Sequence, residues 1–115
     1  MKIPGFQNVL VDENKLTGYL LSETHPAGKH KARFFIRFGF AADAPQALQE
    51  ALKKHASNDY IRVEQGSFGT RYIVEATLES PDGRNPLLRS VWFVETDDAA
   101  AKLVTAYPVH DGGGR

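Results

Sequence analysis

The chain has 115 residues, of which 42% are hydrophobic, so it is long enough to bury the core of one domain without disulfides or metals. Fourteen basic and fourteen acidic residues cancel, which removes the overall positive field typical of many nucleic-acid binders. The absence of cysteine excludes disulfides, thiolate metal sites and cysteine nucleophiles. With no secretory signal and no run approaching the ~20 apolar residues of a membrane span, we expect a soluble cytoplasmic domain.

The first helical pattern follows an irregular lead-in over residues 1–11. Asp12 can accept hydrogen bonds from the free N–H groups of a first helical turn. Leu16, Tyr19 and Leu20 then lie at the i, i+3, i+4 spacing of one helix face. The spacing predicts a helix that ends near residue 21, with Tyr19 on its apolar face.

The second helical pattern begins after a loop over residues 22–28. Phe34, Phe35 and Phe38 lie on one side of a helix that starts at Lys29. Gly39 is placed to end this helix, because glycine tolerates the left-handed backbone that often closes a helix.

The third helical pattern combines a predicted cap with a buried stripe. Asp43 precedes Gln46 by three residues, which is the spacing of a capping box. The last turn should place positive charge at the negative end of the helix dipole. The predicted stripe comprises Ala44, Ala47, Leu48, Ala51 and Leu52, and the last turn holds Lys53, Lys54 and His55.

The second half of the chain changes to the two-residue period of β-strands. Four strands are predicted, over residues 60–64, 70–79, 87–95 and 102–109, with short turns at 66–69 and 81–84. This order predicts an α+β fold in which N-terminal helices pack on one face of a four-stranded antiparallel meander. We expect a single domain over residues 1–109 and a flexible C-terminal tail over 110–115.

The predicted second helix carries a ridge of positive charge. Lys29, Arg33 and Arg37 recur every four residues, so they share one side of the helix. Between residues 28 and 55 there are six basic residues against two acidic ones. Such a ridge is suited to phosphate groups or an acidic partner, although solvated basic helix faces without a ligand are also common.

Two histidines lie at the start of this ridge. His25 and His30 are candidates for general acid–base catalysis, since histidine titrates near neutral pH. Lys31 could neutralise charge that develops on a phosphate. The alternative is that both histidines are merely exposed. Nothing in the segment predicts a metal site, and no cofactor is expected.

Four further candidates lie on the predicted strands. Arg71 is a candidate site residue. Ser90 could line a concave site together with Thr105 and Tyr107, which share a strand face. The alternatives are a cross-strand ion pair for Arg71 and ordinary strand packing for the three hydroxyl residues.

Several segments resemble a small bacterial domain of unknown function that occurs alone and at the C-terminus of toxin-like and phage-associated proteins. They lie at residues 15–21, 25–35, 39–40, 69–72, 81–84, 89–92 and 103–108, so the resemblance covers nearly the whole chain. The order of elements is also similar, more distantly, to the metal-independent ribonuclease fold of barnase, EndoU, the colicin tRNases and the RelE/ParE toxins.

This wider resemblance implies a toxin-like, metal-independent endoribonuclease that acts with a small antitoxin or immunity protein. Its implied catalytic residues are His25, His30, Lys31, Thr105 and Tyr107, and its implied RNA-binding residues are Lys29, Arg33, Arg37, Arg71 and Ser90. Two alternatives remain open. One is a non-catalytic module whose basic helix face binds an acidic protein or a nucleic acid, and the other is an antitoxin or immunity-type adaptor.

Overall fold

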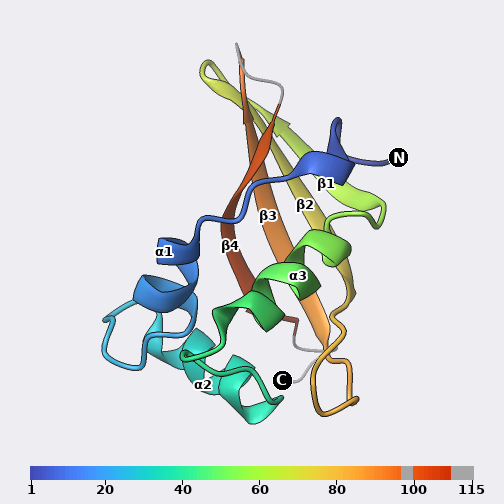
Figure 1. Cartoon of the computed structure of the whole chain (residues 1–115). Coiled ribbons are helices and arrows are strands. Elements are labelled where there is room, and N and C mark those ends of the chain that lie inside the picture. Colours follow the sequence, from blue (N-terminus) through green and yellow to red (C-terminus); the bar gives the residue numbers. More distant parts are fainter. Residues whose placement is uncertain (97–99, 110–115) are drawn as a thin grey trace.

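In the computed structural model, which describes residues 1–96 and 100–109, the helices precede the strands in the chain and lie against one face of an antiparallel sheet (Figure 1). The sheet order is β1-β2-β3-β4, which confirms the predicted α+β meander. The helical elements are η1 (Phe6–Asn8), α1 (Glu13–Lys15), η2 (Leu16–Leu20), α2 (Lys29–Arg37) and α3 (Pro45–His55). The strands are β1 (Tyr60–Gln65), β2 (Gly69–Thr77), β3 (Leu87–Glu95) and β4 (Ala101–Pro108). The predicted C-terminal tail lies outside the described residues.

The first helix begins as predicted and then changes its winding. Asp12 Oδ1 accepts a 2.9 Å hydrogen bond from the backbone N–H of Asn14, so it caps α1. The next five residues form the π-helical turn η2, in which Leu21 N–H donates to Leu16 O. A π-turn fits an additional residue into one helical turn and so changes the direction of the side chains that it carries, including Tyr19.

The core lies between the helices and the sheet. Trp92 from β3 is fully buried there, together with Phe35 from α2 and Leu52 from α3. Figure 1 shows the lead-in and α3 crossing this same face of the sheet. Of the predicted phenylalanine side of α2, Phe35 is buried, whereas Phe34 and Phe38 are half-buried.

Helix α3 starts one residue later than predicted. Its N-cap is Ala44, and Asp43 makes no capping hydrogen bond. Pro45 occupies the first turn, where its fixed φ suits a helix and its missing N–H needs no partner. The predicted capping box is therefore wrong. The buried stripe is also displaced: Pro45, Leu48, Leu52 and His55 are buried, whereas Ala44 and Ala47 are exposed.

The C-terminus of α2 closes through the predicted glycine. Gly39 has a φ of 105°, and its N–H donates to Ile36 O while Phe40 N–H donates to Phe35 O. These two bonds form a Schellman motif, which satisfies carbonyl groups that the helix end would otherwise leave free.

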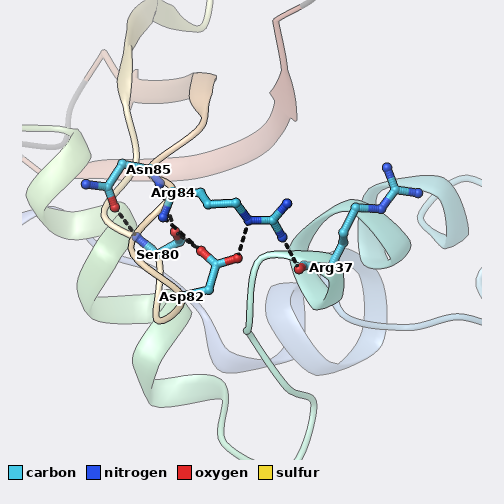
Figure 2. A network of polar contacts seen from close by, with 5 residues as sticks. All are labelled: Arg37, Ser80, Asp82, Arg84 and Asn85. Atoms are coloured by element: carbon cyan, nitrogen blue, oxygen red, sulfur yellow. Dashed lines mark hydrogen bonds and ion pairs between the residues drawn. The ribbon is translucent and has the colours of Figure 1, made fainter.

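The loop between β2 and β3 holds this end of α2 in place (Figure 2). Asp82 Oδ1 accepts hydrogen bonds from the Ser80 hydroxyl and from the backbone N–H of Arg84. Arg84 Nε donates to Asp82 Oδ2 at 2.6 Å. The hydrogen bond from the Arg84 backbone N–H is the main cause that lowers the pKa of Asp82. Arg84 Nη2 also donates to the carbonyl of Arg37 at 2.7 Å. The loop thus fixes α2 relative to the sheet.

Candidate functional site

A hollow of about 680 Å³ lies beside β4, where η2 and the loop before α2 meet this strand. Its lining combines charged, aromatic and hydroxyl side chains from three separate segments. They are Asp12, Asn14, Lys15, Tyr19, His25, Val104 and Thr105.

An irregularity in β4 places one wall of the hollow. Thr105 pairs with Val91 and Leu103 pairs with Trp92, so Val104 has no partner on β3. A bulge of this kind bends the strand and changes the direction of its side chains. Beyond it, Thr105 Oγ1 lies 3.2 Å from the hydroxyl of Tyr19.

Tyr19 is the central residue of the hollow. Its hydroxyl accepts a 2.8 Å hydrogen bond from Lys31 Nζ of α2, and Lys15 Nζ lies 5.8 Å from its ring centroid. Burial alone would raise the pKa of the Tyr19 phenol. The hydrogen bonds from Lys31 and Thr105 and the positive charges of Lys31 and Lys15 outweigh this, so the pKa lies below the ordinary value of 10.

His25 is held in a single orientation by the backbone that follows it. Its Nδ1 accepts hydrogen bonds of 3.0 Å from the N–H groups of both Ala27 and Gly28, and its ring lies edge-on to Tyr19 with a centroid distance of 5.1 Å. Because Nδ1 accepts, the hydrogen of the neutral ring is on Nε2. His25 can therefore donate a hydrogen bond from Nε2 in the hollow, while its Nδ1 is occupied by the two backbone donors.

Close packing at Gly28 joins α2 to the hollow. A Cβ atom at this position would lie 2.3 Å from the carbonyl oxygen of Tyr19. Only glycine lets the start of α2 come this near to η2, and this approach brings Lys31 within reach of the Tyr19 hydroxyl.

The helices carry the basic residues that have no acidic partner. Within residues 1–96 and 100–109, six cations have no carboxylate oxygen within 4.0 Å: Lys15, Lys29, Lys31, Arg33, Arg37 and Lys53. The arginines of the strands are paired, as in Arg62–Glu64 at 3.0 Å and Arg89–Glu75. Four of these six cations lie on α2, and Lys15 shares the lining of the hollow with Asp12.

The structure brings together three of the sequence-predicted site residues, His25, Lys31 and Thr105. His30 lies on the same helix as Lys31 and is exposed, as are the predicted phosphate ligands on that helix. These exposed ligands are Lys29, Arg33 and Arg37.

The remaining predicted site residues lie elsewhere on the sheet. Arg71 is 3.7 Å from Glu64 in the cross-strand ion pair that was its alternative interpretation. Tyr107 lies opposite Arg89 and raises the pKa of that guanidinium, after the larger effect of Glu75.

Ser90 is fully buried rather than available to a phosphate. Its Oγ lies 2.7 Å from His55 Nδ1 and accepts a 2.8 Å hydrogen bond from Trp92 Nε1. His55 Nε2 lies 2.9 Å from Ala76 O and 3.1 Å from Leu88 O, so it donates to carbonyls and Nδ1 accepts from Ser90. His55 was expected to add positive charge at the C-terminal end of α3, but it is buried between α3 and the sheet, where it hydrogen-bonds to Ser90.

Two residues of the hollow were missed from the sequence as site residues. Tyr19 was assigned to the apolar face of the first helix, and Lys15 was given no role. Their spacing of four residues was the available signal, since it places a cation beside a phenol on one helix face.

Two other features are absent from the described part of the chain. Residues 1–96 and 100–109 contain no group of three or more His, Asp or Glu side chains arranged to hold a metal ion. Nor does this part of the chain include a helix of the length and apolarity that crossing a membrane requires.

Comparison with known proteins gives one family and one fold. The model of a domain of unknown function (DUF6883) matches residues 2–110. A solved structure described as a contact-dependent growth inhibition toxin–immunity protein complex from Klebsiella pneumoniae 342 contains a similar chain, with a TM-score of 0.64 and 20% identity. The match covers 91% of this chain and 97% of that one, and at this identity it shows a common fold. No curated protein matches the sequence.

Proposed function

Since the chain belongs to the DUF6883 family, a family of unknown function, we propose from the chemistry of its own hollow that it is a metal-independent endoribonuclease domain of a toxin–immunity system. The observation that carries this proposal is the 2.8 Å contact between Lys31 Nζ and the Tyr19 hydroxyl. The fixed cation lowers the pKa of the phenol and so favours its phenolate, which can take the proton of an attacking ribose 2′-hydroxyl.

The proposed reaction assigns one role to each side chain of the hollow. Tyr19 Oη takes the proton of the 2′-hydroxyl, the 2′ oxygen forms a bond to phosphorus, and the bond from phosphorus to the 5′ oxygen breaks. The 5′ oxygen takes a proton from Lys15. The products end in a 2′,3′-cyclic phosphate and a 5′-hydroxyl, and exchange of both protons with water restores Tyr19 and Lys15.

The other residues support these two. Lys31 and the Thr105 hydroxyl donate hydrogen bonds to the phenolate and so stabilise it. His25 Nε2–H is oriented to donate to a phosphate oxygen, where negative charge increases during the attack. The requirement for a 2′-hydroxyl makes RNA, and not DNA, the substrate.

Single-turnover cleavage of tRNA or total RNA in excess EDTA tests the proposal. Tyr19→Phe removes the proton acceptor, and we expect the rate to fall by about 10²–10⁴-fold. Lys31→Met should raise the Tyr19 pKa and move the pH–rate profile towards higher pH. Lys29→Met is the matched control, because Lys29 is an exposed lysine of the same helix. If purified protein cleaves no RNA and its expression leaves growth unimpaired, the proposal is wrong.

Two observations support a toxin–immunity setting. The fold is that of a chain in a toxin–immunity complex, and α2 presents exposed cations without acidic partners within residues 1–96 and 100–109. An acidic protein that covered α2 would neutralise this charge and block access to the adjoining hollow. Co-purification with the product of the adjacent gene, and loss of RNA cleavage in that complex, are the expected results.

The exposed cations also favour a second candidate, a non-catalytic module that binds an acidic protein or a nucleic acid through α2. In that case Arg33→Glu would abolish binding of the partner, whereas Tyr19→Phe would leave that binding unchanged. An immunity-type adaptor is the third candidate, and for it the co-purified partner, rather than this chain, would cleave RNA.

A further inference from the structure

A second hollow of about 610 Å³ adjoins the first. It lies between the lead-in, α3 and β4, and shares Asp12 and Lys15 with the hollow around Tyr19. Its lining is Val9, Leu10, Val11, Asp12, Lys15, Gln49, Lys53, Lys102 and Leu103. The two hollows therefore meet at Asp12 and Lys15, beside β4.

Hydrogen bonds hold the walls of this second hollow in place. Leu10 N–H donates to Ala101 O at 2.8 Å, and Leu103 N–H donates to Leu10 O at 3.0 Å, so the lead-in is joined to β4. From α3, Gln49 Nε2 donates to Val11 O at 2.9 Å. A ligand would meet a preformed surface and would not have to order a loop.

The lining combines an apolar surface with three lysines and one carboxylate, that of Asp12, so its charge is positive on balance. Leu10 is 49% exposed, so an aliphatic side chain faces whatever occupies the hollow. Lys15 and Lys53 both line it, and neither has a carboxylate within 4.0 Å among the described residues. Lys54, the next residue along α3, is bound to Glu79 instead. Apolar area next to free cations suits a ligand that is itself part apolar and part anionic.

We infer that this second hollow binds the single-stranded RNA next to the cleavage site, an inference that rests on the proposed function. Lys15 is shared by the two hollows and contacts the phosphate between them, Lys53 binds the next phosphate along the strand, and the intervening base lies against Leu10. The contacts assigned to this subsite are to phosphates and a base, none of which requires a 2′-hydroxyl, so it accepts either RNA or DNA single strands. Sequence preference should be weak, because an aliphatic contact and point charges do not distinguish bases.

Binding of a non-cleavable strand tests this inference apart from catalysis. The probe is a fluorescently labelled 12-nucleotide DNA strand, and its affinity for the protein is measured by fluorescence anisotropy at several salt concentrations. For single strands, each neutralised phosphate contributes about 0.7 to the slope of log K against log salt. Lys53→Met should lower that slope by about this amount, whereas the neighbouring Lys54→Met should leave it unchanged. Thermal unfolding of both variants shows that the comparison is between folded proteins.

Cleavage of a dinucleotide separates the two proposals. A dinucleotide fills only the first hollow, so Lys53→Met should cleave it at the wild-type rate while its KM for longer RNA rises. If Lys53→Met and Lys54→Met bind the strand alike, the second subsite is refuted, and cleavage at Tyr19 is unaffected. If binding depends on Lys53 but no RNA is cleaved, the subsite is supported and the endoribonuclease proposal fails.

Discussion

Substitution of Ser90 tests the buried network that fixes α3 to the sheet, and so the wall that carries Lys53. In Ser90→Ala, His55 Nδ1 loses its hydrogen-bond donor and Trp92 Nε1 loses its acceptor. Both partner side chains are at most 2% exposed, so water cannot readily replace the hydroxyl.

The expected loss of stability follows from these two orphaned groups. Leaving one buried polar group unsatisfied costs about 1–3 kcal/mol, so we expect Ser90→Ala to lower the free energy of unfolding by about 2–4 kcal/mol. That is a large part of the ~5–15 kcal/mol by which a domain of this kind is stable. Urea denaturation followed by circular dichroism measures the change directly.

Ser57→Ala provides the matched control. Its hydroxyl donates to Lys54 O at 2.6 Å near the surface, where water can replace it, and we expect a change within about 0.5 kcal/mol. If Ser90→Ala proves as mild as Ser57→Ala, the buried network does not stabilise the fold and the reasoning is refuted.

Three further predictions concern pH and glycine. Burial lowers the pKa of His55 below its ordinary 6.5, although hydrogen bonds to two carbonyls oppose it, so the unfolded chain binds a proton more readily. The free energy of unfolding in urea should therefore be constant above about pH 6.5 and should decrease as the pH falls from that value towards the folded pKa of His55. An increase in the free energy of unfolding over that pH range would contradict the prediction. Gly28→Ala should force η2 away from α2 and slow RNA cleavage at least about tenfold. Gly18→Ala is the control and should cleave RNA at the wild-type rate, because no atom lies within 4 Å of the added Cβ. Equal cleavage rates for the two variants would contradict the close approach of Gly28 to Tyr19. Gly39→Ala places a side chain at a φ of 105° and should lower the urea-unfolding free energy by about 1–3 kcal/mol, and an unchanged value would refute the strain.

The fold could be predicted because each of its elements has a local signal. The two-residue period predicted all four strands to within two residues. Asp12 marked a helix start through its side-chain oxygen, and Gly39 marked a helix end through its positive φ. The error at α3 has the same local origin. Pro45 and Asp43 both favour a helix start, and the fixed φ of proline prevailed over the side-chain cap.

The candidate site could be predicted only in part, because its geometry depends on two irregular features. Neither the π-turn that carries Tyr19 nor the bulge at Val104 produces a recognisable spacing of apolar residues in the sequence. His55 illustrates a second reason. The partner of its Nδ1, Ser90, is 35 residues away, so no helical pattern could distinguish a buried histidine from one that complements a helix dipole.

The most direct test of the account is the end-group chemistry of RNA incubated with the purified protein in excess EDTA. We predict fragments that carry 2′,3′-cyclic phosphate and 5′-hydroxyl ends with the wild-type chain, and intact RNA with Tyr19→Phe. Fragments with 3′-hydroxyl ends, or equal cleavage by both proteins, would show that Tyr19 does not activate a ribose hydroxyl. Intact RNA in both reactions would contradict the proposed activity itself.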